Sequence, residues 1–345
     1  MVFPKKILVT SASGRVGKAA LAYLNKMRGD YNSSKGDGVV LEKCVIRATA
    51  RVVAEKGEYL KSIGADEVIA FDLAQPETWK AAIEGCDAVL STSMDSLIPE
   101  HMEFAKYLGE HKHQIKHVVR ISCFGAETNT YSYNKDVHSS KAGAGVPLML
   151  QHYWWSEECL INAGLHVTSL RGNFYMNHLL KNETESIEKN GFFSTCLGDC
   201  KNSFVCANDM GEAAATCLLE GPERHANKFY EITGPEPQSM YEIADDLSTA
   251  LGKKIEYKAQ DFAQFEQDFG ATRAAFFEYL RNGFYTRCSS DFYNITGKKA
   301  TSYKEYLTNK GPYGETGVEE LFSSAGAIFK KGEDAFKDLA KIQKA

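Results

Sequence analysis

A turn of small residues near the amino end carries the strongest chemical signal in the sequence. It follows the apolar stretch 7–10 and precedes a segment in which apolar residues recur at helical spacing from Val16 onward. Gly14 lets the backbone approach a diphosphate without an intervening Cβ, and Gly17 lets the helix pack closely on the strand. The helix then offers free N–H groups and a positive dipole end to the phosphates. We expect a dinucleotide cofactor to be bound by Thr10, Ser11, Ser13, Gly14, Arg15, Val16 and Gly17.

The departure of this turn from the usual fingerprint leaves an alternative open. Ser11 stands where the usual pattern has its first glycine, and serine is less suited to a tight turn. An ordinary Ser/Gly turn between a strand and a helix, with no ligand, has the same composition. The position of the turn within a strand–helix–strand unit favours cofactor binding.

The end of the second expected strand indicates which cofactor is bound. An NAD site usually offers a carboxylate there to the ribose hydroxyls, whereas a 2′-phosphate requires arginine. Here the strand ends at Arg51 and no acidic residue follows until Glu55. We therefore expect Arg51 to bind a 2′-phosphate, so that NADP(H) is preferred and NAD(H) remains an option. The alternative is that Arg51 is a solvated surface residue.

The elements that position these residues alternate between strand and helix through the first half of the chain. Such alternation predicts an α/β fold of the Rossmann type, with a doubly wound parallel sheet. The polar segment 28–38 is expected to be a long flexible loop. Strands are expected at 7–10, 44–48, 67–71, 88–90 and 118–121, and helices at 54–63, 76–83 and 100–110.

The second half of the chain is less regular. Helical patterns cover 155–163 and 241–251, and a strand is expected at 166–170. Asp209 is expected to be the N-cap of a helix over 210–219, because its carboxylate can accept free backbone N–H groups. The tail 311–345 is expected to be helical.

Composition excludes several classes of protein. The chain has 345 residues, a net charge of −5 and no segment of membrane-spanning length, so we expect neither a nucleic-acid surface nor a membrane protein. Its nine cysteines are scattered without a Cys-x-x-Cys pair, which favours a reduced, cytoplasmic setting. Cys196, Cys200 and Cys206 with His178 do not have the spacing of a structural zinc site, and no metal is expected.

The motifs together resemble the NmrA-like branch of the atypical short-chain dehydrogenases/reductases. The resemblance runs from about Lys5 to about Leu307, and it rests on the order of many short motifs. These motifs are Thr10–Gly17, Ile46–Arg51, Phe71–Leu73, Gly85–Leu90, Glu157–Gly164, His166–Arg171, Phe174–Asn177, Phe229–Pro235 and Ile295–Gly297.

The resemblance implies a division into domains and a set of residues near the cofactor. The cofactor domain would comprise 1–172 and about 203–221, and a smaller α/β substrate domain about 173–202 and 222–310. By the same resemblance, Asp72 and Leu73 lie near the adenine, Ser122 approaches the nicotinamide, and Phe174 lies by its ring. The cofactor would also run along Ser91, Thr92 and Ser93.

Three residues are candidates for the catalytic proton donor. Tyr131 and Lys135 have the Tyr-x-x-x-Lys spacing of typical short-chain dehydrogenases, but the polar, glycine-rich segment around them indicates a coincidence. By the resemblance, Tyr153 falls where some reductases of the family carry lysine and some quinone reductases carry histidine, so Tyr153 or its neighbour His152 could donate a proton. Both residues could equally pack a helix against the sheet. Ser122 completes the set of catalytic candidates.

We therefore expect an NADPH-dependent reductase of a quinone-like or conjugated carbonyl compound, with a small hydrophobic or aromatic substrate. A quinone needs no dedicated acid, because its developing oxyanion is delocalised and a donor such as Asn173 or water suffices. The alternative is a non-catalytic NADP(H) sensor that binds a protein partner. A biosynthetic reductase with a narrow substrate is a third hypothesis, and a homodimer is left open.

Overall fold

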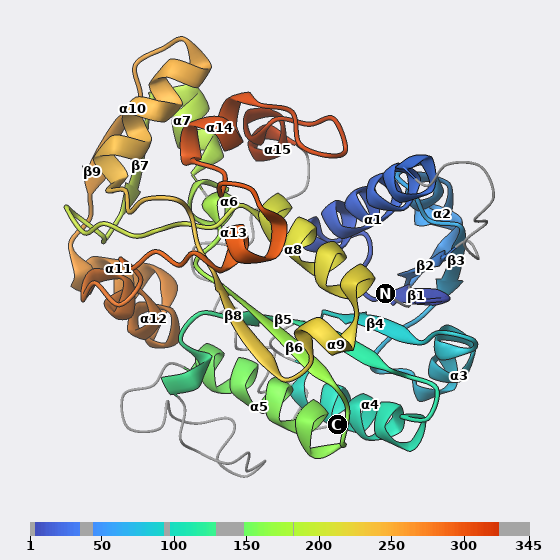
Figure 1. The fold of residues 1–345 in the computed structure, drawn as a ribbon. Coiled ribbons are helices and arrows are strands. Elements are labelled where there is room, and N and C mark those ends of the chain that lie inside the picture. Colours follow the sequence, from blue (N-terminus) through green and yellow to red (C-terminus); the bar gives the residue numbers. More distant parts are fainter. Residues whose placement is uncertain (1–3, 35–43, 93–96, 129–147, 182, 324–345) are drawn as a thin grey trace.

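Seven parallel strands form the central sheet of the molecule (Figure 1). The structure is a computed structural model, and it describes residues 4–34, 44–92, 97–128, 148–181 and 183–323. The strand order is β3-β2-β1-β4-β5-β6-β8, which confirms the expected doubly wound sheet. Because helices cover both faces, the strands are apolar on both sides, and Ile7, Leu8 and Val9 are fully buried. The strands are β1 Lys6–Val9, β2 Val45–Ala50, β3 Glu67–Ala70, β4 Ala88–Ser91, β5 His117–Cys123, β6 Val167–Gly172 and β8 Lys228–Ile232.

Helices pack on both faces of this sheet. Helices α1, α2 and α8 cover one face, and α3, α4 and α5 cover the other. Close packing of α1 on α8 requires Gly211, since an added Cβ there would lie 2.4 Å from the Cβ of Ala19. The bounds are α1 Arg15–Ser34, α2 Val53–Ser62, η1 Pro76–Thr78, α3 Trp79–Ile83, α4 Ile98–Glu110, η2 Ala126–Thr128, α5 Leu148–Asn162, α8 Ala207–Glu220 and α9 Pro222–His225.

Helix α1 is longer than the sequence predicted. It continues to Ser34, so the expectation of a loop was wrong for 28–34, and residues 35–38 lie outside the described part of the chain. Tertiary contacts explain the difference. Arg28 forms an ion pair with Asp66, and its Nη1 donates to the carbonyl of Cys44 at 2.8 Å. These contacts hold a polar helical end that has no apolar pattern of its own.

The amino end of α8 also differs from the prediction. Cys206 is the N-cap, and Asp209 lies in the first turn of the helix rather than before it. The carboxylate of Asp209 accepts hydrogen bonds from the backbone N–H and the hydroxyl of Thr301, at 2.7 and 2.6 Å. Burial raises the pKa of Asp209 to about 6. Asp209 thus ties α8 to a distant segment instead of capping it.

The smaller part of the molecule lies beside the sheet (left in Figure 1) and has an aromatic-rich core of its own. Within 222–310, which was assigned to the smaller domain, β8 pairs with β6 in the central sheet and α13 packs against α8. The chain therefore returns to the larger part twice within this range. The remaining elements are α6 Met176–Leu180, α7 Thr184–Asn190, β7 Phe192–Thr195, α10 Met240–Leu251, β9 Glu256–Ala259, α11 Phe262–Phe269, α12 Ala271–Arg281, α13 Asp291–Thr296, α14 Tyr303–Thr308 and α15 Gly317–Phe322.

The expected helical tail is described only in part. Helix α15 lies within it, and residues 324–345 lie outside the described residues. In the part of the chain that the structure describes, no helix is long and apolar enough to span a bilayer.

Candidate functional site

The turn between β1 and α1 is closed by backbone hydrogen bonds and by close approach of two glycines. The N–H of Gly14 donates to the carbonyl of Ser11 at 2.9 Å. A Cβ on Gly17 would lie 2.4 Å from that same carbonyl oxygen, and one on Gly14 would lie 3.1 Å from it. Ser11 has a φ of +48°, in the left-handed region that glycine adopts freely. Ser11 therefore takes the backbone shape of the first glycine of the usual fingerprint.

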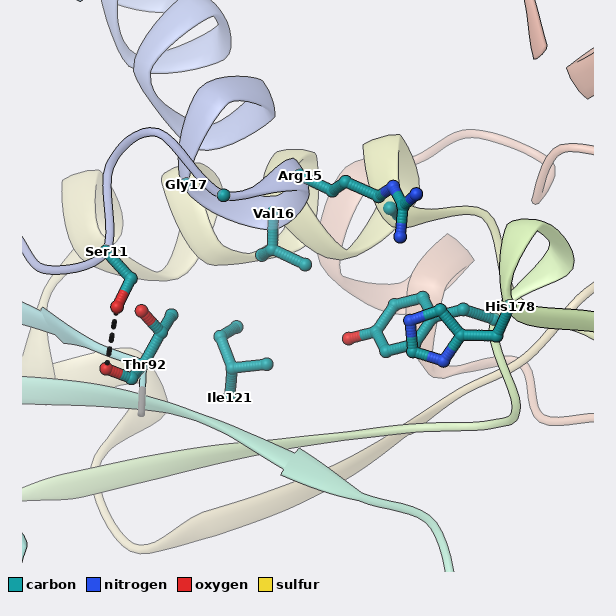
Figure 2. A pocket seen from close by; sticks show the side chains of 10 residues that line it. Ser11, Arg15, Val16, Gly17, Thr92, Ile121 and His178 are labelled. Carbon is teal, nitrogen blue, oxygen red and sulfur yellow. Dashed lines mark hydrogen bonds between the residues drawn. The ribbon is translucent and has the colours of Figure 1, made fainter. Parts of the chain in front are cut away.

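The strand order places this turn at the switch point of the sheet. The chain leaves β1 toward β2 on one side, whereas β4 flanks β1 on the other side. In open α/β sheets, ligands bind at the carboxyl ends of the strands where the order reverses. Ser91 is the buried last residue of β4, and Thr92 follows it. The hydroxyl of Ser11 donates to the carbonyl of Thr92 at 3.3 Å, which joins the turn to the end of β4 (Figure 2).

A cavity of about 250 Å³ opens at this point. Figure 2 shows Ser11 and Thr92 on one side of it and Arg15 and His178 on the other. Six of the predicted cofactor residues line it. The cavity therefore joins the turn between β1 and α1 to the end of β4. The lining consists of Ser11, Gly14, Arg15, Val16, Gly17, Thr92, Ile121, Tyr175, His178 and Ala207.

The residues present at this cavity fit a dinucleotide diphosphate. The first N–H groups of α1 have no partner within the helix, and they lie beside the cavity that Arg15, Val16 and Gly17 line. A Cβ on Gly17 would clash with the backbone of Ser11 and Ala12, so the tight turn that leads into these N–H groups requires glycine at this position. Ser13, also predicted, is exposed and is not among the lining residues. Thr10 is buried beneath the turn, and its hydroxyl donates a hydrogen bond to the carbonyl of Leu90 in β4.

The residues predicted for the adenosine end lie at the ends of β2 and β3. Arg51 directly follows β2 and is exposed, and no other described residue forms an ion pair or hydrogen bond with it. Asp72 follows β3, and its carboxylate accepts the N–H of Ala74 at 3.0 Å. Leu73 is 9% exposed. Ser93 lies outside the described residues. Arg51 and Asp72 therefore lie just beyond the carboxyl ends of β2 and β3, and their contacts with a cofactor stay predictions.

The three catalytic candidates lie around the sheet end, and none of them is a lining residue. Ser122 on β5 is buried, and its Oγ has no hydrogen-bond partner among the described residues. His152 on α5 is fully buried, with its ring 5.7 Å from that of Trp155. Tyr153 is partly buried, with the guanidinium of Arg120 5.9 Å from its ring centroid. Their roles stay predictions, and Tyr131 and Lys135 lie outside the described residues.

His178 is a lining residue that the sequence did not assign to the cofactor site. It directly follows the motif that ends at Asn177, and its ring lies 5.1 Å from Tyr175 and 5.7 Å from Phe174. Burial, together with the positive charges of Arg15 and Arg273, lowers the pKa of His178 to about 3. The imidazole is therefore neutral at ordinary pH and presents one N–H donor. Its position after β6 was the signal available in the sequence.

Asn173 and a run of aromatic residues over 262–279 serve the packing of the protein. The amide of Asn173 donates to Ser203 at 3.0 Å and to the carbonyl of Tyr285 at 3.2 Å, so these bonds already engage it. The rings of the aromatic run 262–279 gather in the core of the smaller part, where Phe276 lies 5.4 Å from Phe174. Among the described residues, no group of three His, Cys, Asp or Glu side chains lies close enough to hold a metal ion.

Comparison with known proteins adds independent findings. No family model matches the chain. An NAD(P)H azoreductase from Xenophilus azovorans is 25% identical over 269 residues, which cover 76% of this chain and 79% of the azoreductase. This chain is therefore similar to that enzyme over most of both lengths.

Three solved structures share the fold. Triphenylmethane reductase from Citrobacter sp., complexed with NADP(H), has a TM-score of 0.66 and 24% identity, over 87% of this chain and 98% of that one. The NADPH complex of quinone oxidoreductase QOR2 from Escherichia coli has a TM-score of 0.65 and 22% identity, over 87% and 97%. NmrA, a negative transcriptional regulator in complex with NADP, has a TM-score of 0.63 and 15% identity, over 89% and 95%.

The fold, the turn and the relatives agree with the resemblance carried by the sequence motifs. The sheet order, the glycine-dependent turn and the cavity at the switch point are all present in one chain. In fold and in sequence motifs the chain resembles the NmrA-like NAD(P)-binding reductases.

Proposed function

We propose that this protein is an NADPH-dependent reductase of quinone-like or conjugated carbonyl compounds. One observation carries the proposal: the amino end of α1 and the neutral imidazole of His178 line the same cavity. The amino end of α1 fits the diphosphate of the cofactor. The N–H of His178 fits the oxygen of an acceptor, which gains negative charge during reduction. The names of the azoreductase, the triphenylmethane reductase and QOR2 support reduction of a conjugated acceptor.

The cofactor, when bound, supplies a hydride to the acceptor, and a proton from water completes the two-electron reduction. The protein contributes binding, orientation and charge stabilisation. The first turn of α1 binds the diphosphate, and Arg51 binds the 2′-phosphate. The N–H of His178 donates to the acceptor oxygen as negative charge develops on it.

The acceptor itself makes a dedicated acid unnecessary. Charge on a reduced quinone or enone is delocalised, so a fixed N–H donor and solvent suffice for its protonation. Val16, Ile121 and the ring of Tyr175 line the cavity and provide apolar surface for a flat substrate. This proposal therefore needs neither His152 nor Tyr153 as a proton donor.

The test is NADPH oxidation by purified protein with a panel of quinones, enones, azo dyes and triphenylmethane dyes. We expect acceleration by at least one of these classes and a lower rate with NADH. Absence of acceleration by every acceptor, with NADPH bound, would rule the proposal out.

A non-catalytic sensor of NADP(H) is the second candidate function. It is favoured by the positions of His152 and Tyr153, neither of which lines the cavity, and by the fold shared with the regulator NmrA. It predicts that the redox state of the cofactor changes association with a protein partner. Identical sedimentation with NADP⁺, with NADPH and without cofactor, in the presence of cell extract, would count against it.

A further inference from the structure

An ion pair connects the phosphate-binding turn to the carboxyl-terminal part of the chain. Arg15 is the first residue of α1 and lines the cavity. Its Nε pairs with Oε1 of Glu320, which lies on α15. The side chain of Glu320 is 10% exposed and that of Arg15 is 24% exposed, so the pair is shielded from solvent. Among the described residues, no other contact engages the guanidinium, and its two terminal amino groups stay available to a ligand.

The carboxylate of Glu320 is fixed independently of Arg15. Asn177 donates its Nδ2–H to Oε1 at 2.8 Å, and the hydroxyl of Tyr306 donates to Oε2 at 3.1 Å. Asn177 comes from α6 and Tyr306 from α14. The carboxylate therefore keeps its place whether or not Arg15 points toward it.

The backbone of α15 is held just as firmly. Lys181, which is 3% exposed, donates to the carbonyls of Glu320, Leu321 and Ser323 at 3.2, 2.8 and 2.9 Å. A Cβ on Gly317 would lie 2.5 Å from the carbonyl oxygen of Tyr306, so the helix start packs directly on α14.

The residues that precede α15 contact α1 itself. Nζ of Lys18 lies 4.4 Å from the centroid of the Tyr313 ring and 3.9 Å from the carboxylate of Glu315. The segment 313–323 thus lies between the phosphate-binding helix and the smaller part of the molecule.

We infer that the segment 313–323 is part of the cofactor site, in which Glu320 is a positioning residue that aims Arg15 at the cofactor diphosphate. The carboxylate holds one edge of the planar guanidinium at Nε. The terminal N–H groups on the other edges then match the oxygens of a phosphate. A long side chain that is already held in place loses less rotational freedom when the ligand binds.

Competition between Glu320 and the phosphate is the opposite reading, and the geometry disfavours it. Glu320 contacts Nε rather than the terminal amino groups, and two neutral donors already share its negative charge. The cavity side of Arg15 therefore stays open while the pair is intact.

The test is a double-mutant cycle on NADPH affinity, measured by fluorescence titration without any acceptor. Arg15→Ala should raise the Kd between about tenfold and a hundredfold, because it removes a charged contact to phosphate. Glu320→Gln preserves the size of the side chain and should raise the Kd about tenfold. In the Arg15→Ala background, Glu320→Gln should have no further effect, because Glu320 acts only through Arg15.

A matched control is Glu212→Gln. Glu212 is a buried carboxylate on α8 that pairs with Lys298 and does not line the cavity. Its substitution should leave the Kd within about twofold. Additive effects of the Arg15 and Glu320 substitutions, or tighter binding by Glu320→Gln, would overturn the inference.

Hydrogen exchange supplies a second readout that a merely structural role of Glu320 would not produce. By reciprocity, NADPH should slow exchange in 313–323 in the wild-type protein but not in Arg15→Ala. Equal protection in both proteins at saturating NADPH would also overturn the inference. The inference rests on the cofactor of the proposed function, yet neither readout needs turnover. If the Arg15 and Glu320 substitutions act independently on the Kd while the protein still reduces an acceptor, only the inference about Glu320 fails. If their effects are coupled but no acceptor is reduced, only the proposed reaction fails.

Discussion

Thr10 and Thr92 exchange two hydrogen bonds across the ends of β1 and β4. The N–H of Thr92 donates to Oγ1 of Thr10 at 2.9 Å, and the hydroxyl of Thr92 donates to the carbonyl of Thr10 at 2.9 Å. The entry to the phosphate-binding turn is therefore fixed by the neighbouring strand. This anchoring explains how Ser11 is held in a backbone conformation that normally requires glycine.

The strain at Ser11 leads to the first prediction. Ser11→Gly and Ser11→Ala both remove the hydroxyl, but only glycine adopts a φ of +48° without steric cost. We expect Ser11→Gly to be more stable than Ser11→Ala by about 1 kcal/mol in urea unfolding. Equal stability of the two variants would mean that the turn relaxes to another conformation.

Gly17 gives the second prediction, with Gly29 of the same helix as its control. In Gly17→Ala the new Cβ would meet the carbonyl of Ser11, so the turn must shift. We expect a loss of roughly 1–3 kcal/mol in unfolding free energy, together with weaker NADPH binding. Gly29→Ala meets nothing within 4 Å and should be neutral or stabilising by up to about 1 kcal/mol. NADPH titration of both variants checks this, and unchanged affinity in Gly17→Ala would contradict it.

Cofactor preference depends on Arg51 in the third prediction. Arg51→Glu places a negative charge where the 2′-phosphate is expected, and a carboxylate there suits the ribose hydroxyls of NADH instead. We expect NADPH affinity to fall between about tenfold and a hundredfold, while NADH affinity is kept or improved. Lys56→Glu makes the same charge change at an exposed position of α2 and should affect both cofactors little. A parallel loss for NADH and NADPH would show that Arg51 does not read the 2′-phosphate.

His178 is the subject of the fourth prediction. His178→Leu removes the N–H donor from the cavity and should lower kcat about a hundredfold, as for other oxyanion donors, with little change in NADPH affinity. His178→Asn retains a donor and should recover part of the rate. Steady-state kinetics with the best quinone acceptor measure both effects. A wild-type rate in His178→Leu would remove this residue from the mechanism.

His117 determines the fifth prediction, which concerns stability against pH. Nε2 of His117 and the hydroxyl of Thr168 share a hydrogen bond of 2.7 Å. Burial lowers the pKa of His117 to about 3. Because the unfolded chain binds this proton at pH values near 6.5, its contribution to stability is complete above that pH and is lost as the pH falls toward 3. For this group alone, the loss amounts to roughly 2 kcal/mol at pH 5.

Urea unfolding at pH 7 and pH 5 tests this prediction by comparison of variants. The difference between the two pH values should be smaller by roughly 2 kcal/mol in His117→Gln than in the wild-type protein. His113→Gln, at an exposed position, should keep the wild-type difference. The same pH dependence in all three proteins would contradict the prediction.

Local patterns predicted the first strand–turn–helix unit well. The strand expected at 7–10 is β1 Lys6–Val9, and five of the seven predicted turn residues, all but Thr10 and Ser13, line the cavity. This success has a physical reason, because the turn chemistry and the helix start are decided by residues adjacent in the chain. The alternation of strands and helices likewise predicted a doubly wound parallel sheet, because such alternation restricts the possible topologies.

Features that depend on distant residues were missed. The polar end of α1 is held by Asp66 and Cys44, and Asp209 finds Thr301 rather than the helix start. Neither contact leaves a periodic pattern in the sequence. His178 was missed for a related reason: its neutral state arises from burial and from Arg15 and Arg273, which come from other elements.

The pairing of Arg15 with Glu320 has a consequence for the newly made chain. Synthesis produces Arg15 well before its partner Glu320, which follows about three hundred residues later in the chain. The sheet, which is complete at Ile232, can form before Glu320 has been made. By the inference above, a chain that ends before residue 320 lacks the carboxylate that positions Arg15, and we expect it to bind the dinucleotide less tightly.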